Sequence, residues 1–309
     1  MHALNSASRQ SLASRHYRSF AKINLHLQID ARREDGYHQL RTIFQTVSLH
    51  DRLRLLQSDR PGLRLTVPGG GAPAGETNLA YRAAAAVLAR WAPEMGLDVE
   101  LHKRIPAGGG LGGGSSNAAT VLLALADMLE IASDDVELVT IARALGADVP
   151  YFLVGGTALG EGRGDDIEPL PELAEQEVVL VDPGVSVSTA EIFAALPRPE
   201  RRPLPASVAR LVDGGETASI AEMAGSNDLE SVVFERAPEV LAVYTALRRA
   251  GATFVRLSGS GGTVFACFAK PQRAAQVESY LPSDARVFVA RTLSRSAVNR
   301  QRLVVESES

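Results

Sequence analysis

The chain has 309 residues, of which 45% are hydrophobic and 22% are charged, and its formal net charge at pH 7 is −4. This length predicts about two domains, and the negative charge argues against a broad surface for nucleic acid or an anionic membrane. The single cysteine, Cys267, excludes a disulfide within the chain and lies in an apolar run typical of a buried strand. We therefore expect a protein of a reducing compartment, the cytoplasm.

The N-terminal part of the chain combines a basic tail with two predicted strands. Residues 1–17 contain no acidic residue, which is typical of a disordered tail and, less often, of an organelle transit peptide. From residue 18, the segment RSFAKINLHLQID alternates polar and apolar residues, which predicts a half-exposed strand. An Asp35-Gly36 turn then leads into a second predicted strand, RTIFQTVSLHDRLRLLQ.

Helices and strands are both predicted in the middle of the chain. The alanine-rich segment NLAYRAAAAVLARW predicts an amphipathic helix, and residues 97–105 predict another half-exposed strand. An apolar helix follows Ser115 and Ser116, which are candidates for its N-cap. Although residues 105–126 are uncharged, their glycines, serines and Asn117 exclude a membrane span. Residues 134–146 predict a helix, and residues 147–166 predict an apolar strand region punctuated by glycine.

From about residue 166 strands and helices continue to alternate. Strands are expected in EVVLVDPG and at residues 286–293, and two more, in TFVRLSGSGGTVFACF, are joined by a second glycine loop at residues 258–262. Helices are expected in STAEIFAAL and at residues 217–236, 238–250 and 272–281, with an exposed loop in PRPERRPLP. The half-exposed strands and the lack of a strict βαβ repeat favour an α+β fold with partly antiparallel sheets.

Six glycines fall in the ten residues 105–114, between a predicted strand and a predicted helix, and this position excludes a flexible linker. Gly108, Gly110 and Gly113 fit G-x-G-x-x-G, but the preceding strand alternates, whereas the first strand of a dinucleotide-binding fold is apolar throughout. That interpretation is the weaker alternative, and the absence of a lysine after the glycines excludes a P-loop. The pattern favours a phosphate site at the helix N-terminus over a ligand-free tight turn.

Four segments in this order, SFAKINLHLQI…REDGYH, IPAGGGLGGGSSNAA, LGADVPYF and VRLSGSGGTVF, resemble the GHMP small-molecule kinases over about residues 18–295. The resemblance implies a two-domain α+β fold after the tail. An ATP-binding domain similar to domain 2 of ribosomal protein S5 is expected at residues 18–165, and a ferredoxin-like C-terminal domain at residues 166–300. The extended glycine run and the D-G-Y-H hairpin resemble the branch that acts in non-mevalonate isoprene biosynthesis. That branch uses ATP and Mg²⁺ to phosphorylate the 2-hydroxyl of a cytidine diphosphate-linked methylerythritol.

The resemblance also implies a catalytic pair, Lys22 and Asp148. Taken alone, Lys22 fits a lysine on the wet face of a strand, and Asp148 fits the N-cap of a short helical turn. In the family, the carboxylate accepts or orients the proton of the substrate hydroxyl, and the lysine stabilises charge on the transferred phosphoryl group. The residues that the resemblance implies at ATP are Pro106, Ala107, Gly108, Gly109, Gly110, Leu111, Gly112, Gly113, Gly114, Ser115, Ser116, Asn78 and Lys103.

For the second substrate, the resemblance implies that Tyr37 stacks on the cytosine, that His38 hydrogen-bonds its edge and that Phe193 forms the other side of the stack. From the residues alone, a core position for Phe193 stays open. Asn24 and Thr189 are also expected to contact this substrate. No acidic Mg²⁺ ligand besides Asp148 stands out in the sequence, so nucleotide oxygens, a serine hydroxyl and water are expected to hold the metal.

These features predict an ATP-dependent kinase of a small alcohol that acts as a monomer or weak homodimer, with no nucleic-acid or membrane partner. Two alternatives remain. The first is a GHMP kinase with another small alcohol substrate, which Tyr37, His38 and Phe193 argue against. The second is a non-catalytic nucleotide-binding protein on the same scaffold, which the presence of both Lys22 and Asp148 argues against.

Overall fold

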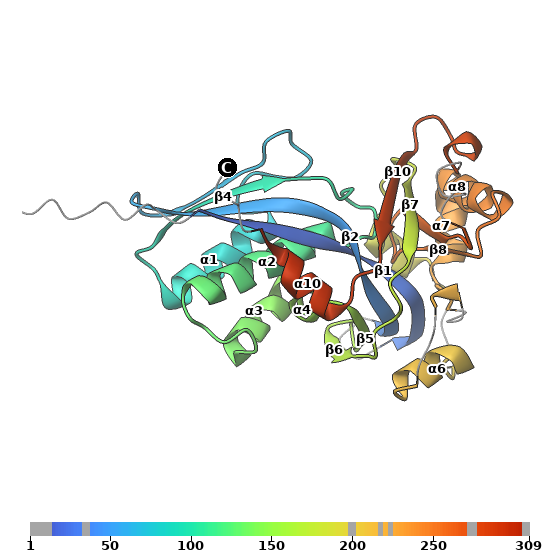
Figure 1. Cartoon of the computed structure of the whole chain (residues 1–309), viewed down its shortest axis with the longest axis horizontal. Helices are drawn as coiled ribbons and strands as arrows, with labels where there is room; N and C mark the ends of the chain where they lie inside the picture. The colour runs from blue at the N-terminus through green and yellow to red at the C-terminus, as the bar shows by residue number, and fades with distance from the viewer. Residues whose placement is uncertain are drawn as a thin grey trace, which may run out of the picture.

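The computed structural model describes residues 14–32, 38–196, 202–215, 219–221, 225–270 and 277–304. In these ranges the chain forms a seven-stranded sheet and a four-stranded sheet, with helices packed on both (Figure 1). The mixture of helices with mainly antiparallel strands confirms the predicted α+β class. Tyr37 and parts of the predicted elements around residues 197–201, 217–236 and 272–281 lie outside the described residues.

The larger sheet has the strand order β11-β1-β2-β4-β3, with β5 paired to β2 and β6 to β5. β3 and β4 are parallel, and the other pairs are antiparallel. Its strands are β1 (Ser14–Arg32), β2 (His38–Ser58), β3 (Leu63–Thr66), β4 (Gly96–His102), β5 (Thr157–Glu161), β6 (Asp166–Pro169) and β11 (Leu303–Val304). The smaller sheet is antiparallel, in the order β10-β7-β9-β8, and comprises β7 (Glu177–Asp182), β8 (Phe254–Leu257), β9 (Val264–Cys267) and β10 (Arg286–Arg291).

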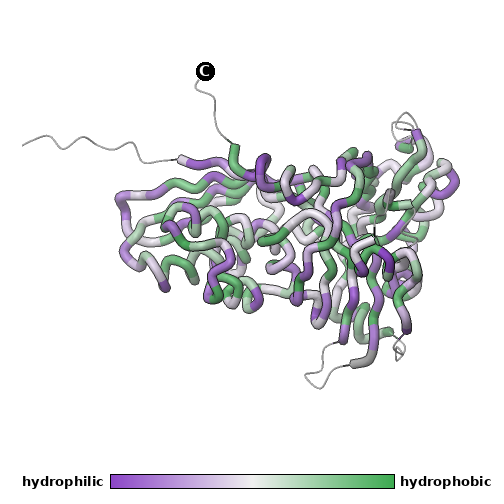
Figure 2. The backbone as a smooth tube through the Cα atoms, turned by 60° about the horizontal axis from the view of Figure 1, so that its bottom comes forward, coloured by the Kyte–Doolittle hydropathy of each residue, from purple (hydrophilic) through white to green (hydrophobic). Residues whose placement is uncertain are grey.

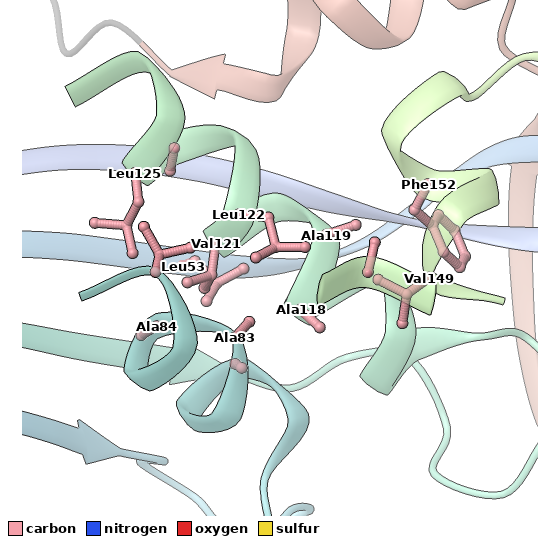
Figure 3. Close-up of a cluster of buried hydrophobic side chains, with 14 of the residues drawn as sticks. Leu53, Ala83, Ala84, Ala118, Ala119, Val121, Leu122, Leu125, Val149 and Phe152 are labelled. Atoms are coloured by element: carbon pink, nitrogen blue, oxygen red, sulfur yellow. The ribbon is translucent and has the colours of Figure 1, made fainter. Parts of the chain in front are cut away.

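Three helices, α1 (Leu79–Trp91), α2 (Gly113–Met128) and α4 (Val149–Val154), pack on the larger sheet, and α3 (Val136–Leu145) packs on these helices (Figure 1). α1 and α2 approach closely because small side chains face each other, Ala83 and Ala84 on α1 against Ala118 and Val121 on α2 (Figure 3). All four of these side chains are completely buried, so the glycine loop leads into a helix that is closely packed against its neighbour. No helix in the described ranges is both long and apolar enough to cross a lipid bilayer.

β1 is buried on both faces, which corrects the half-exposed strand predicted from its alternation. Hydrophobic and hydrophilic residues do alternate along the long strands (Figure 2). However, Lys22, Asn24 and His26 are only 3%, 2% and 1% exposed. Ile23 and Leu25 point the other way and pack with residues of the smaller sheet. The polar face of β1 therefore meets protein rather than water, and its polar groups need partners inside the molecule.

The pairing of β1 with β2 has a β-bulge next to Phe20 and Ala21, where residues 48 and 49 of β2 are extra, and the polar side chains of β1 change direction at this point. On its N-terminal side, the Ser19 hydroxyl contacts the Ser116 hydroxyl (2.8 Å) and the Asn117 side chain (2.7 Å) of α2. Residues 19 and 22 of a regular strand would point to opposite faces. Because of the bulge, Lys22 also points toward the helical layer, where Asp148 lies.

The outer edge of β1 is paired by three segments from distant parts of the chain. β11 pairs with its N-terminal end at Tyr17. In the middle, the Lys22 N–H donates to the Leu111 carbonyl (3.0 Å). Further on, the Leu27 N–H donates to the Ser226 carbonyl (2.7 Å), and the Leu27 carbonyl accepts from residue 228 (3.0 Å). The strand that carries Lys22 is therefore held on both sides.

Three predicted elements of the N-terminal half begin or form differently. β1 starts at Ser14, so residues 14–17 of the predicted tail belong to a strand. α2 starts at Gly113, ahead of Ser115 and Ser116, and its N-cap is Gly112 in the left-handed conformation, with φ 68°. Residues 149–154 form α4 instead of strand, because a proline in the first turn favours a helix start.

The C-terminal half adds several helices around the smaller sheet. They are α5 (Thr189–Ala194), α6 (Ala206–Val212), α7 (Glu230–Arg236), α8 (Pro238–Arg249), the 3-10 turn Val277–Tyr280 and α10 (Arg295–Arg302). α6 and α10 were not predicted, and residues 225–229 form no helix, contrary to the prediction for 217–236. α10 packs its Val298 against Phe20 of β1, so this helix lies on the larger sheet. The predicted domain boundary at residue 165 stays a prediction.

Candidate active site

The glycine loop connects β4 to α2 and turns sharply. Gly108, Gly110 and Gly112 have φ of 72°, 78° and 68°, in the region that favours glycine. Within the described part of the chain, the N–H groups of residues 113–115, the first turn of α2, make no backbone hydrogen bond. These N–H groups and the helix dipole together favour an anion at this point.

A cavity of about 380 Å³ opens over this loop. Its walls are residues 71–73, 77–79, 103, 106–115, 117, 187, 189, 260 and 261. This set includes every predicted ATP residue except Ser116. The Ser116 hydroxyl instead donates to the Phe20 carbonyl (2.6 Å) and is buried between α2 and β1. Of the two serines at the start of α2, Ser115 is the one that lines this cavity.

Asn78 and Lys103 both line the cavity, and both have structural partners. The Asn78 side chain caps α1, accepting from the Ala80 N–H (2.9 Å) and donating to the Pro73 carbonyl (2.7 Å). The Lys103 ammonium forms an ion pair with Asp51. Asp51 was not predicted as a site residue, although its position in the sequence indicates that it is buried. It falls in phase with the apolar residues 49, 53 and 55 of its strand, where a carboxylate must find buried partners.

The second glycine loop, residues 258–262, supports the first. The Ser258 hydroxyl donates to the Gly110 carbonyl (3.0 Å), and the Thr263 N–H donates to the Gly109 carbonyl (3.2 Å). A Cβ atom on Gly261 would lie 2.1 Å from the Gly110 nitrogen, so no larger residue fits there. The two loops therefore hold each other through backbone contacts.

Lys22 and Asp148 are brought together beside these loops. The Lys22 ammonium lies 3.5 Å from an Asp148 carboxylate oxygen and donates to the Asn24 side-chain oxygen (2.7 Å). Asn24 in turn donates to the Thr42 hydroxyl (2.7 Å), which fixes its orientation. The Asp148 side chain makes no capping hydrogen bond to α4 and is 34% exposed. A buried, fixed ammonium thus faces a carboxylate that solvent or a ligand can reach.

Gly112 and Gly259 place Lys22 between the two glycine loops. A Cβ atom on Gly112 would lie 3.1 Å from the Lys22 side chain, and one on Gly259 would lie 3.2 Å from its ammonium nitrogen. Gly112 also lines the cavity and caps α2. The ammonium, the free N–H groups of α2 and the Asp148 carboxylate therefore converge on one region.

The residues predicted for the second substrate lie partly together. The rings of His38 and Phe193 are in contact, with centroids 5.6 Å apart and planes tilted by 34°. Phe193 and Thr189 belong to α5, and the Thr189 hydroxyl contacts the Ser260 hydroxyl (2.7 Å) at the cavity wall. α5 thus connects the cavity to the aromatic pair. Phe193 is half-buried against neighbouring apolar residues, which agrees in part with the core position left open above.

His26 is a further buried polar residue of β1 that the sequence analysis did not single out. Its Nδ1 accepts from the Ser226 N–H (3.2 Å), and its Nε2 is buried without a partner in the described part of the molecule. Burial lowers the pKa of His26 to about 4, so the ring is neutral at neutral pH. It lies two residues beyond Asn24 on the same strand and adds no charge to the site.

Comparisons with known proteins show the family to which this chain belongs. Residues 78–156 match the family model of the GHMP kinases N terminal domain, and residues 208–286 match that of the GHMP kinases C terminal domain. The 4-diphosphocytidyl-2-C-methyl-D-erythritol kinase of Pelotomaculum thermopropionicum is 40% identical over 278 residues, covering 89% of this chain and 96% of the relative. The kinase of the same name from Geobacter sulfurreducens is 41% identical over 250 residues, covering 80% of this chain and 88% of the relative.

Solved structures give the same result. A crystal structure of 4-(cytidine 5'-diphospho)-2C-methyl-D-erythritol kinase superposes with a TM-score of 0.75 at 37% identity, covering 90% of this chain and 98% of that one. A homoserine kinase from Cytophaga hutchinsonii superposes with a TM-score of 0.68 at 21% identity, covering 94% of this chain and 98% of that one. The second likeness concerns the fold alone.

Proposed function

Because this chain belongs to the 4-diphosphocytidyl-2-C-methyl-D-erythritol kinases of the GHMP kinase family, we propose that it transfers the γ-phosphoryl group of ATP to the 2-hydroxyl of 4-diphosphocytidyl-2-C-methyl-D-erythritol. The observation that carries the proposal is the pair of Lys22 and Asp148, 3.5 Å apart, beside the N-terminus of α2. The products are ADP and the 2-phosphate of the second substrate.

Asp148 is the proposed acceptor of the hydroxyl proton. The substrate oxygen attacks the γ-phosphorus, the bond to the bridging oxygen breaks, and its electron pair leaves on ADP. The proton passes to the exposed carboxylate of Asp148, which is free of capping bonds. Lys22 supplies a positive charge near the transferred group, and Asn24 keeps its ammonium from rotating away. Positioning and fixed charge are thus the main contributions of the protein.

The nucleotide phosphates are proposed to bind at the glycine loop. The phosphates would lie at the end of the cavity where α2 begins. There the N–H groups of residues 113–115 and the positive end of the helix dipole offset the negative charge of the phosphates. The interlocked loops resist displacement, so these donors are already arranged before ATP arrives. Prearranged donors need not be reorganised during phosphoryl transfer.

Mg²⁺ fits this site as a partner of the nucleotide. The described residues contain no group of three or more acidic, histidine or cysteine side chains that could hold a metal by themselves. Mg²⁺ prefers oxygen ligands and keeps several waters, so phosphate oxygens, the Ser115 hydroxyl and water are a suitable set. The ion would neutralise charge on the phosphates.

The second substrate is proposed to bind along α5. Phe193 offers a face for the cytosine, His38 offers a polar edge, and Thr189 lies at the wall of the nucleotide cavity. Tyr37 remains a predicted stacking partner. Because one chain carries all of these groups, we propose that the monomer is the active unit. The free, buried thiol of Cys267 supports a cytoplasmic location.

The test is ADP release with Mg-ATP and purified 4-diphosphocytidyl-2-C-methyl-D-erythritol, with a new phosphate monoester followed by phosphorus NMR. Asp148→Asn is expected to lower kcat by about 10²–10⁴ with KM nearly unchanged, the range for a lost general base. Asp166→Asn, on the surface strand β6, is the matched control and should keep wild-type turnover. Full turnover by Asp148→Asn would remove Asp148 from the mechanism. Turnover of homoserine or mevalonate in place of the proposed substrate would point to another branch of the family.

A further inference from the structure

Asp51 is a carboxylate completely removed from solvent, at the point of β2 that lies next to the exit of β4. It receives three donors from one short stretch of chain. The N–H groups of Arg104 and Ile105 donate to one of its oxygens (2.7 and 2.8 Å), and the Lys103 ammonium pairs with the other. A buried carboxylate is stable only with such partners, and here all of them belong to the entrance of the glycine loop.

Lys103 connects Asp51 to the cavity, at the end where α2 begins. Its side chain is 9% exposed and lines the cavity. Its ammonium would lie 3.1 Å from a Cβ atom on Gly113, the first residue of α2. A cation at a helix N-terminus is repelled by the helix dipole. Asp51 provides the counter-charge that keeps the ammonium there in the absence of a ligand.

We propose that Asp51 is a positioning residue for the nucleotide, which holds the Lys103 ammonium at the N-terminus of α2 so that it can contact a phosphate of ATP. The inference rests on the proposed function, because it concerns the same nucleotide. Asp51 touches no ligand itself. It acts on nucleotide affinity through the charge of Lys103, and its two backbone contacts fix the loop entrance from which Lys103 extends.

The test is a double-mutant cycle on nucleotide binding. Asp51→Asn keeps an oxygen for the backbone donors but loses the charge that orients Lys103. We expect it to weaken the binding of Mg-ADP, measured by calorimetry, and to raise KM for ATP, each by about tenfold, the effect of one charge-assisted hydrogen bond. Neither kcat nor the KM for the alcohol substrate should change by more than about twofold. In the Lys103→Met background, the same Asp51→Asn change should have no further effect on Mg-ADP affinity.

Equal losses in both backgrounds would overturn the proposal, because Asp51 would then act only through the loop backbone. Unchanged Mg-ADP affinity in Asp51→Asn would overturn it too. If circular dichroism shows that Asp51→Asn does not fold, the Mg-ADP affinity of Lys103→Met decides the question. An affinity equal to that of wild type would contradict the proposal. Arg104→Met is the matched control. It removes the same charge from the next residue, whose side chain is exposed, and should leave Mg-ADP affinity unchanged. If wild type itself binds no Mg-ADP, the proposed kinase function has failed instead.

Discussion

Substituting alanine for Gly110 should separate the two glycine loops. A Cβ atom at this position would lie 2.0 Å from the Ser258 carbonyl oxygen and 2.9 Å from the Gly261 nitrogen, and both are backbone atoms that cannot rotate away. Contacts under 3.0 Å are essentially never seen for a real Cβ atom, so the loops must move apart by about 1 Å. The φ of Gly110, 78°, adds strain for any residue with a side chain.

These two effects give the expected size. The left-handed conformation costs about 1–2 kcal/mol for a non-glycine residue, and overpacking costs about 1–3 kcal/mol. We therefore expect Gly110→Ala to lower the free energy of unfolding by about 2–5 kcal/mol. The hydrogen bond from the Ser258 hydroxyl to Gly110 should be lost as well, and KM for ATP should rise because the phosphate donors are no longer held in place.

Urea unfolding followed by circular dichroism measures the stability change. Gly114→Ala is the matched control, because its Cβ atom would meet only Leu79 Cδ1, at an ordinary 3.6 Å, inside α2. Alanine is the better helix former, so this variant should be as stable as wild type or up to about 1 kcal/mol more stable. If Gly110→Ala unfolds with the free energy of Gly114→Ala, the interlocking of the loops has no energetic role and the reasoning is refuted.

Three further predictions concern residues outside the loops. Phe193→Ala should raise KM for the cytidine substrate by about 5- to 150-fold in steady-state kinetics, since stacking on a base contributes about 1–3 kcal/mol, and it should leave KM for ATP unchanged. The pKa of His26 is lowered from 6.5 to about 4 in the folded protein, so the unfolded chain takes up its proton first as the pH falls. The contribution of neutral His26 to the free energy of unfolding is therefore present above pH 6.5 and lost progressively toward pH 4. In urea titrations, His26→Gln should reduce the loss of unfolding free energy between pH 7 and pH 5 by about 2 kcal/mol. Burial raises the pKa of Cys267 to about 12, so Ellman's reagent should modify it only in denaturant, and rapid reaction of the native protein would contradict the buried position in β9.

Local patterns in the sequence predicted most of the long elements but missed α6 and α10 and predicted a strand where α4 forms. Alternation identified the strands around β1 and β4, and alanine-rich amphipathicity identified α1, because these features arise from contacts between neighbouring residues. The start of α2 was wrong, since serine is a preferred N-cap but the left-handed turn at Gly112 allows an earlier start. Residue preferences at the N-cap do not indicate whether a helix begins after a left-handed glycine or after a capping serine.

Long-range packing decided what the patterns left open. The smaller sheet covers the apolar face of β1, as the alternation predicts. Nothing local to Asn24 or His26 indicates that the polar face is also covered, by the second glycine loop near Asn24 and by the loop at residues 225–228 near His26, so the strand looked half-exposed. Asp51 is a second residue whose partner local patterns could not identify. Its position among apolar residues signals a buried partner, but the partner lies about fifty residues away in sequence, at Lys103. The proposed catalytic pair came instead from the family resemblance, whereas the glycine pattern itself already favoured a phosphate site.

The pairing of β1 has a consequence for how the protein is made. Its edge partners are at Leu111, residues 226–228 and β11, so pairing along the edge of β1 is complete only when the last described residues have been synthesised. At about 5–20 residues per second, this edge stays open for on the order of 15–60 s during synthesis. The buried polar row of Lys22, Asn24 and His26 would discourage β1 from pairing with other nascent chains during that interval. The same side chains would then serve a second purpose, protecting the strand before the active site exists.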